Sequence, residues 1–325
     1  MTSTRPKLFL IDAMYLVYRS YYAFSKKPPT TGSGLNTSAM LGFTNTIWDL
    51  LQKQRPTHFA VAFDSMEPTE RHETFLDYKA NREATPEDII TSIPYIYSIC
   101  DAMNIPVLVS EGYEADDIIG TLARQAEAEG FNVFIFTADK DLGQCTSDHI
   151  FIYRPGRAGN PDEILGPEQV TARFGIKRVD QVADMLGLWG DASDNIPGIP
   201  GVGEVMAKKL LAEFDTVENL IQNYTKIGNP KLREKVGQYA DQALLSKQLA
   251  TILYDVPVTF NEEMFRVSKP DKQKLTPLFA ELEFRNLAKR ILDANDNETL
   301  AEKTARQEMH SEPEVTEVPE EKIKQ

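Results

Sequence analysis

Residues 7–153 alternate short apolar segments with longer amphipathic ones, and this alternation constrains the fold more than any other feature. Segments of strand length span 7–11, 58–63, 105–109, 131–136 and 150–153. Helical patterns begin near Asn36 or Thr37, at Pro86 and near Glu114, where capping residues or a first-turn proline are found. Strands that alternate with helices predict an α/β domain whose mostly parallel sheet is flanked by helices. We place this domain at residues 1–166.

The second half of the chain has a different pattern. From 167 to 292 it shows helical periodicity, little strand signal and short connections, and we interpret it as a helical subdomain packed on the sheet domain. Residues 293–325 hold ten acidic and four basic side chains but few apolar ones, so we expect a disordered acidic tail or linker there.

Carboxylates follow four of the predicted strands at the point where each strand ends. They are Asp12, Asp64, the group Glu114, Asp116 and Asp117, and the pair Asp139 and Asp141. The carboxyl ends of parallel strands share one sheet edge, where ligands bind, so the seven side chains should converge. A single Asp after a strand is more often a turn residue or a helix cap, but repetition at four strand ends favours a shared site.

Seven carboxylates at one sheet edge would repel one another and raise their own pKa values, and divalent cations remove that conflict. Oxygen ligands suit Mg²⁺ or Mn²⁺, and the chain offers no Cys/His set for zinc, since its two cysteines and four histidines are scattered. Asp191 and Asp194, just before a dense Gly/Pro stretch, extend the predicted metal set to nine. We expect two or more metal ions.

The net charge of −14 argues against a nucleic-acid ligand only until its distribution is considered. The tail carries −6 and the rest of the chain −8, and without the nine proposed metal ligands the rest would be +1. Bound metal would make it more positive. An acidic composition therefore does not exclude a DNA-binding protein.

A helix–hairpin–helix pattern is predicted at 195–211, where Gly201-x-Gly203 is followed by Ala207, Lys208 and Lys209. The glycines permit a tight turn and let the backbone approach a phosphate, and the next helix presents its N-terminal N–H groups. Such a device binds the sugar–phosphate backbone without reading bases. The alternative is an ordinary glycine-rich connection between helices.

A basic segment, Arg71 to Arg82, connects Asp64 to the helix at Pro86 and should lie above the same sheet edge. Arg71, Lys79 and Arg82 could face a scissile phosphate, and Tyr78 could stack on a base. If the segment is helical, the spacing of three puts Lys79 and Arg82 near one face. The alternative is a surface helix with solvated basic residues.

No apolar run is long enough for a membrane helix or a signal peptide, so we expect a cytoplasmic protein without a membrane partner. Two cysteines cannot build a disulfide framework, and we interpret both as core thiols.

Seven stretches occur in the order of a known family, over about residues 7 to 290. They are Phe9–Asp12, Val61–Asp64, Tyr78–Arg82, Glu111–Asp117, Thr137–Leu142, Gly190–Gly198 and the hairpin. With them the chain resembles the 5′ nuclease (5′-3′ exonuclease) domain of bacterial DNA polymerase I, within the flap endonuclease family. Ala13 departs from the Gly found in many members. No polymerase or proofreading domain follows, so we expect either a fragment of a longer polymerase or a stand-alone nuclease.

The resemblance implies two metal groups, one of Asp12, Asp64, Glu114, Asp116 and Asp117 and one of Asp139, Asp141, Asp191 and Asp194. It also implies that Lys79 and Arg82 clamp the scissile phosphate, that a helical arch near 65–90 passes a free 5′ strand, and that hairpin carbonyls hold K⁺. The expected activity is a Mg²⁺-dependent, structure-selective 5′-3′ exonuclease and flap endonuclease that uses two metal ions in primer removal and DNA repair.

The expected substrates are 5′ flaps, nicks and RNA-primed ends, and the expected partner is a DNA polymerase in cis or in trans, with the nuclease itself monomeric. Two alternatives remain. An RNA-directed nuclease of the related PIN type is disfavoured by the hairpin and the helical subdomain, and a catalytically silent DNA binder is disfavoured by the complete carboxylate set.

Overall fold

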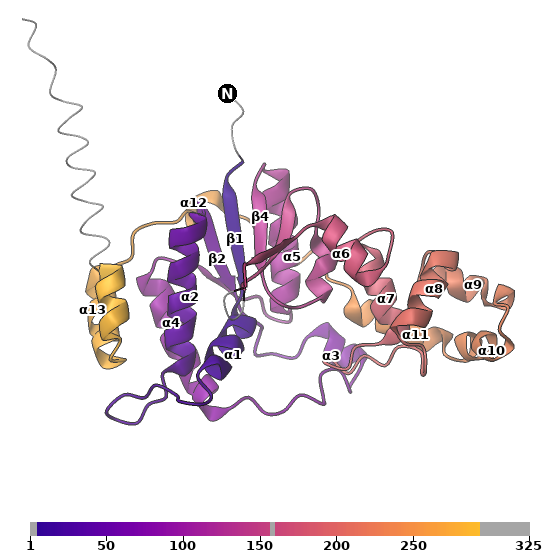
Figure 1. Cartoon of the computed structure of the whole chain (residues 1–325), viewed down its shortest axis with the longest axis horizontal. Helices are drawn as coiled ribbons and strands as arrows, with labels where there is room; N and C mark the ends of the chain where they lie inside the picture. Colours follow the sequence, from indigo (N-terminus) through magenta and orange to yellow (C-terminus); the bar gives the residue numbers. More distant parts are fainter. Residues whose placement is uncertain (1–4, 157–159, 293–325) are drawn as a thin grey trace, which may run out of the picture. The chain divides into compact units, whose positions relative to one another are not determined.

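The computed structural model describes residues 5–156 and 160–292, and the predicted tail at 293–325 lies outside these ranges. Its central feature is a six-stranded sheet with the order β3-β2-β1-β4-β5-β6 (Figure 1). The strands are β1 (Lys7–Asp12), β2 (His58–Ala62), β3 (Val107–Leu108), β4 (Asn132–Phe136), β5 (Ile150–Arg154) and β6 (Glu163–Leu165). The first five pair in parallel and β6 pairs antiparallel to β5, which confirms the mostly parallel sheet.

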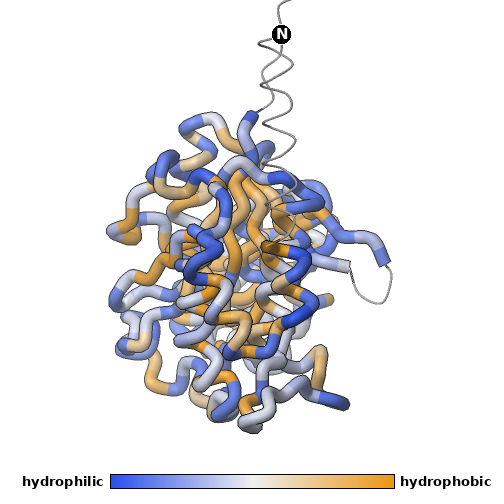
Figure 2. The backbone as a smooth tube through the Cα atoms, turned by 90° about the vertical axis from the view of Figure 1, so that its left-hand side faces the viewer, coloured by the Kyte–Doolittle hydropathy of each residue, from blue (hydrophilic) through white to orange (hydrophobic). Residues whose placement is uncertain are grey.

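Helices cover both faces of the sheet, as predicted. α1 (Ala13–Ala23), α2 (Ser38–Gln54) and α4 (Glu87–Ala102) contact one another, whereas α5 (Ala115–Ala128) packs on β1 and β4. Side chains alternate along a strand, so Leu8 and Leu10 share one core with α5 while Phe9 stacks between Phe59 and Phe134 elsewhere. Figure 2 shows these strands as the hydrophobic centre of the tube. Burial on both faces explains why the strands are apolar throughout.

Several boundaries differ from the prediction. The segment expected at 105–109 contributes only the two residues of β3, and Pro86 caps α4 instead of starting it. The sequence reading missed α1, because its four tyrosines obscure the helical pattern, and it missed β6, which is three partly exposed residues at the sheet edge.

The remaining elements are mostly short helices. They are α3 (Glu70–Thr74), η1 (Asp141–Cys145), α6 (Pro167–Phe174), α7 (Gln181–Trp189), α8 (Glu204–Phe214), α9 (Val217–Gln222), η2 (Tyr224–Lys226), α10 (Pro230–Gln238), α11 (Ala240–Ala250), α12 (Glu262–Phe265) and α13 (Lys272–Glu281). Elements α7 to α11 share their own core, which includes Val182, Leu186 and Leu210. Between 167 and 292 the structure has no named strand, in agreement with the predicted helical region.

Contacts divide the chain into two compact units, Met1–Asp271 and Lys272–Gln325. All of the predicted site residues lie in the first unit. Within the described ranges no helix is both long and apolar enough to cross a bilayer.

Candidate functional site

The carboxyl ends of the central strands open into a crevice of about 210 Å³. Four aspartates line it, and we call them the acidic crevice: Asp12 at the end of β1, Asp64 after β2, Asp116 in the first turn of α5 and Asp139 after β4. β1 lies between β2 and β4, where the winding of the sheet reverses, and α/β sheets bind ligands at such a point. The structure thus brings these four side chains together, as the strand ends predict.

Backbone and hydroxyl groups hold two of the crevice aspartates in place. Asp12 Oδ1 accepts the Tyr15 N–H at 3.0 Å, and its Oδ2 accepts the Thr137 hydroxyl at 2.9 Å. Asp64 Oδ1 accepts the Ala115 N–H at 2.9 Å. The sequence reading did not single out Thr137, although a Thr two residues before Asp139 was the available signal.

The electrostatics of the crevice oppose ionisation. Burial and the neighbouring charges of Asp64 and Asp139 raise the pKa of Asp12 to about 7. Burial together with Asp139 and Asp12 holds the pKa of Asp116 well above its usual range, and burial with Asp194 and Asp191 raises the pKa of Asp139. The fold therefore gathers negative charge that it does not itself neutralise.

Beside the crevice lies a second acidic group formed by Asp141 and Asp191. Asp141 Oδ1 is buried and has no hydrogen-bond partner among the described residues, the Lys140 ammonium being 3.6 Å away. Lys140 instead bonds to Asp191. Burial and the Asp139 charge hold the pKa of Asp141 well above its usual range.

The loop that carries Asp191 and Asp194 is shaped by close backbone packing. Gly190 (φ +80°) and Gly198 (φ +57°) meet there, and a Cβ on Gly198 would lie 2.3 Å from the Gly190 nitrogen. Asp191 and Ile196 exchange both backbone hydrogen bonds at 2.8 Å. Neither glycine can be replaced without moving the loop.

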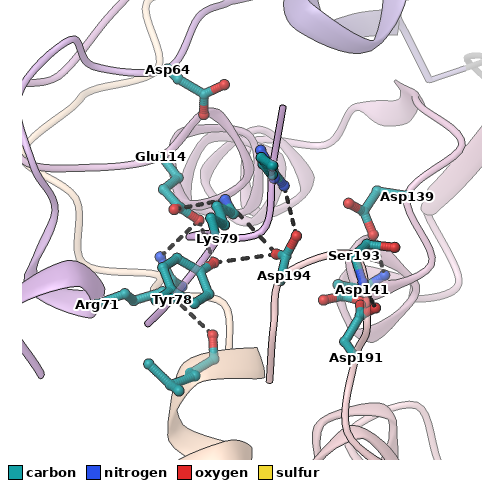
Figure 3. Close-up of polar contacts among 12 residues, drawn as sticks. Asp64, Arg71, Tyr78, Lys79, Glu114, Asp139, Asp141, Asp191, Ser193 and Asp194 are labelled. Atoms are coloured by element: carbon teal, nitrogen blue, oxygen red, sulfur yellow. Dashed lines mark hydrogen bonds and ion pairs between the residues drawn. The ribbon is translucent and has the colours of Figure 1, made fainter. Parts of the chain in front are cut away.

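Residues 78–82, which we call the basic strap, bridge Glu114 and Asp194 (Figure 3). Lys79 Nζ lies 2.8 Å from Glu114 Oε1 and 3.8 Å from Asp194 Oδ2, and Arg82 Nη2 lies 2.6 Å from Asp194 Oδ1. Burial alone would raise the pKa of Asp194, but Lys79 and Arg82 hold it below its usual value. Burial opposes the Lys79 charge, yet Glu114 and Asp194 keep its pKa above normal.

The strap is not helical, so the condition under which Lys79 and Arg82 would share one helix face is not met. Residues 76–82 form turns, and Lys79 itself has a left-handed φ of 57°. Between residues 65 and 90, where the resemblance implies a helical arch, the structure has α3 and the start of α4 with turns between them. Both cations nevertheless line the acidic crevice.

The structure also corrects the predictions for Tyr78 and Arg71. Tyr78 is buried, and its hydroxyl donates to Glu114 at 3.1 Å, so in this arrangement its ring has no open face for a base. Arg71 is buried as well, and it binds Asp117 and Glu114 instead of facing solvent. Both are held by internal contacts that the sequence pattern does not reveal.

Asp117 was predicted as a metal ligand, but the structure directs it away from the crevice. It is fully buried, and its two oxygens accept from Arg71 at 2.6 and 2.8 Å and from the Leu253 N–H at 2.8 Å. Consecutive helix residues differ by about 100° in direction, which is why Asp116 lines the crevice while Asp117 does not.

The hairpin adopts the compact turn that was predicted. Gly201 has φ +77°, and Ala207 of α8 is fully buried. A Cβ added to Gly203 would meet no atom within 4 Å, so nothing inside the protein requires glycine there. Lys209 is exposed, and Lys208 pairs with Glu204 at 2.5 Å.

An apolar groove of about 1100 Å³ adjoins the acidic crevice and shares Asp64 and Arg82 with it. We call it the aromatic groove, because Tyr18, Tyr22, Phe63 and Tyr97 line it. Phe63 and Tyr97 stack with ring centroids 4.7 Å apart, and Tyr22 is 56% exposed.

The donor chemistry of the crevice fits divalent cations that prefer oxygen ligands. The unpartnered Asp141 Oδ1 and the raised pKa values are what uncompensated ligand carboxylates show. In the part of the chain that the structure describes, no three Asp, Glu, His or Cys side chains are close enough to hold one ion by themselves. Mg²⁺ does not need such a cage, since it usually keeps waters and binds one or two carboxylates plus substrate phosphates.

Two family models match the chain. "5′-3′ exonuclease, N-terminal resolvase-like domain" matches residues 7–175, and "5′-3′ exonuclease, C-terminal SAM fold" matches residues 177–273. DNA polymerase I of Bacillus subtilis is 40% identical over 287 residues, which cover 88% of this chain and 32% of that protein. DNA polymerase I of Synechocystis is 37% identical over 300 residues, which cover 90% and 30%. The chain thus spans about a third of the length of these relatives.

Solved 5′ nucleases have the same fold. The zinc-bound bacteriophage T5 5′-exonuclease matches with a TM-score of 0.65 at 19% identity, over 75% of this chain and 89% of that one. The catalytic core of Rad2, in complex with a DNA substrate, matches with a TM-score of 0.62 at 18% identity, over 89% and 92%. The first family model alone covers more than half of the chain, so the chain belongs to the 5′-3′ exonuclease family.

Proposed function

We propose that the chain is a metal-dependent, structure-selective 5′ nuclease that hydrolyses DNA phosphodiesters. The observation that carries this proposal is a crevice of uncompensated carboxylates bordered by two cations, Lys79 and Arg82. Divalent cations would balance the carboxylates, and a phosphate group would balance the two basic side chains. The T5 5′-exonuclease was solved with divalent metal ions and the Rad2 core with DNA, which supports the same ligands here.

The crevice aspartates would hold one metal group, and Asp141 and Asp191 would contribute to a second. Glu114 and Asp194 bind the strap in this structure. When bound, two such ions supply an activated water and stabilise the attacking and leaving oxygens. Oxygen-only ligands favour Mg²⁺, with Mn²⁺ as a substitute.

Lys79 and Arg82 would bind the scissile phosphate. Charge grows on its oxygens as the bond breaks, and a cation fixed there favours the transition state over the ground state. Arg82 is half exposed, so its remaining N–H groups can reach a ligand, whereas Lys79 would exchange a Glu114 contact for a phosphate contact. This role is the one predicted for both residues.

The substrate would lie across three surfaces. The aromatic groove offers stacking faces to the bases of a single-stranded 5′ end, and Arg82 joins that groove to the crevice. The hairpin would bind the duplex backbone, since Gly203 leaves open space for close approach and is the N-cap of α8. K⁺ held by the hairpin carbonyls would strengthen that contact.

We further propose that the substrates are 5′ flaps, nicks and RNA-primed ends, and that a DNA polymerase acts with the chain in cis or in trans. The DNA polymerase I relatives support this partner, as the match covers one third of their length. The same proposal assigns the chain a role in primer removal and DNA repair. It would act there as a monomer in the cytoplasm.

The test is incubation with a 5′-labelled flap duplex, with Mg²⁺ and with a chelator, and sizing of the products. We expect Mg²⁺-dependent release of the flap and weak cleavage of single-stranded RNA. Faster cleavage of the RNA would favour an RNA-directed PIN-type nuclease, and binding without turnover would favour a silent DNA binder.

A further inference from the structure

Arg71 makes more contacts than an ordinary surface arginine of a connecting segment. Its Nε donates to the Leu249 carbonyl at 3.0 Å, and one Nη2 hydrogen donates to the Thr251 carbonyl at 2.8 Å. The other contacts are to carboxylates, Asp117 at 2.6 and 2.8 Å and Glu114 at 3.3 Å. These five contacts account for all five N–H donors of a guanidinium.

The Asp117 carboxylate is likewise fully engaged by hydrogen bonds from within the protein. Both of its oxygens are engaged by Arg71, and Oδ1 also accepts the Leu253 N–H. With no exposed surface, the carboxylate has no open direction toward an external ion. Burial opposes the Arg71 charge, but the bidentate contact with Asp117 raises the pKa of Arg71.

Residues 249–253, the last two residues of α11 and the three that follow it, are the third part of the arrangement, and we call them the brace. Arg71 and Asp117 bind the brace on the Glu114 side. On the other side Gln144 donates to the Ala250 carbonyl at 2.9 Å, accepts the Ile252 N–H at 3.0 Å and donates to the Asp141 carbonyl at 3.0 Å. The brace thus connects the backbone that carries Glu114 with the backbone that carries Asp141.

We propose that Arg71 and Asp117 are positioning residues of the metal site: as a bidentate pair anchored on the brace, they fix the Glu114 carboxylate beside the acidic crevice. This inference rests on the proposed function for its purpose, but its geometry does not. Glu114 Oε2 accepts from Arg71 and Tyr78, which leaves Oε1 directed at Lys79. Groups that orient metal ligands typically affect metal affinity or activity by about 10- to 100-fold.

Two variants test the proposal without changing the net charge of the site. Arg71→Lys keeps the charge and Asp117 but cannot reproduce five planar donors. The double variant Arg71→Met, Asp117→Asn removes one charge of each sign, and its new amide oxygen can still accept the Leu253 N–H. Arg124→Lys is the matched control. Arg124 is exposed on α5, the helix that carries Asp117, and it stacks on Tyr254 next to the brace.

The probe is Tb³⁺ luminescence, which reports cation binding without requiring cleavage. We expect both charge-neutral variants to weaken Tb³⁺ binding by a similar factor of about 10, and Arg124→Lys to match the wild type. Asp116→Asn provides the reference for loss of a direct ligand. Single-turnover cleavage in Mg²⁺ should fall in parallel, while flap affinity in Ca²⁺ changes less than about twofold.

Other outcomes overturn the proposal. If Arg71→Lys binds Tb³⁺ like the wild type while the double variant resembles Asp116→Asn, Asp117 is a direct ligand. If both charge-neutral variants bind normally and melt at the wild-type temperature, the pair does not position the site. A wild type that binds Tb³⁺ but cleaves no flap would refute the proposed nuclease function and leave the positioning result intact.

Discussion

Buried carboxylates lie in opposite surroundings in the acidic crevice and at Asp194, which the basic strap binds. In the crevice, burial and neighbouring aspartates raise the pKa of Asp12 to about 7. At the strap, Lys79 and Arg82 hold the pKa of Asp194 below its usual value, although it too is buried. The chain compensates the charge of Asp194, whereas it does not compensate the crevice carboxylates.

The difference indicates which carboxylates need a binding partner from outside the chain. A fold that can pair Arg71 with Asp117 and Arg82 with Asp194 could also have paired a cation with each crevice aspartate. Leaving Asp12, Asp116 and Asp139 facing one another costs stability, and such costs collect at functional sites. The two largest expected effects each come from one side of this contrast.

The largest effect should come from the crevice. Asp116→Asn removes a proposed ligand worth several kcal/mol of transition-state stabilisation, so flap cleavage in Mg²⁺ should fall by about 10³-fold or more. Relief of repulsion should leave the melting temperature unchanged or higher. Asp148→Asn, at an exposed position, is the control. Wild-type turnover of the Asp116 variant would remove it from the ligand set.

The strap should give the next largest effect. Lys79→Ala and Arg82→Ala should each lower single-turnover cleavage of bound flap by about 10²-fold, by analogy with the loss of one oxyanion donor. Flap affinity measured in Ca²⁺ should change much less. If affinity falls while the rate at saturation holds, the two cations steer DNA toward the site and do not act on the scissile phosphate.

The hairpin should give a smaller and purely electrostatic effect. Lys208→Ala combined with Lys209→Ala should weaken duplex binding for all sequences alike and lower the salt slope by up to about two. Titrating binding against salt measures this. Lys53→Ala with Lys7→Ala, two exposed lysines elsewhere in the first unit, is the control pair. An unchanged slope would exclude the hairpin lysines as phosphate contacts.

The smallest effect concerns pH and lies outside both regions. Burial lowers the pKa of His58, and nearby Arg266 lowers it further despite Glu262 and Glu263. The unfolded chain therefore binds a proton near pH 6.5 that the folded chain resists, so His58 should cost stability as the pH falls below that value. His58→Gln should reduce this loss in denaturant titrations at about pH 7 and about pH 5.5. An identical loss in the variant would show that His58 does not contribute.

Part of the site follows from local sequence and part does not. Asp12, Asp64 and Asp139 could be predicted to meet because a parallel sheet aligns the ends of its strands, whatever the loops do. The role of Asp117 could not be predicted from local sequence, because Arg71, which occupies both of its oxygens, is 46 residues away along the chain. Arg71 in turn binds carbonyls 178 and 180 residues away, and no spacing pattern reports contacts of that range.

The strap is a second region of which only part could be predicted from the sequence. Its residue types predict a cationic segment near the crevice, and Lys79 and Arg82 do line it. Its backbone could not be predicted, because the left-handed φ of Lys79 accompanies a hydrogen bond from its own N–H to the Asp194 carbonyl. Helical spacing therefore does not apply to the strap, because a tertiary contact accompanies its local conformation.

The dependence of Arg71 on the brace has a consequence for the order in which the protein matures. During synthesis, strands β1 to β5 are complete once residue 154 has been added, but Arg71 and Asp117 find their backbone partners only at residues 249–253. At about 5–20 residues per second, roughly 5–20 s separate the two events. In that interval the newly made chain has its sheet and its acidic edge without the pair that orients Glu114. The newly made chain would thus complete the contacts around Glu114 late, once residues 249–253 have been added.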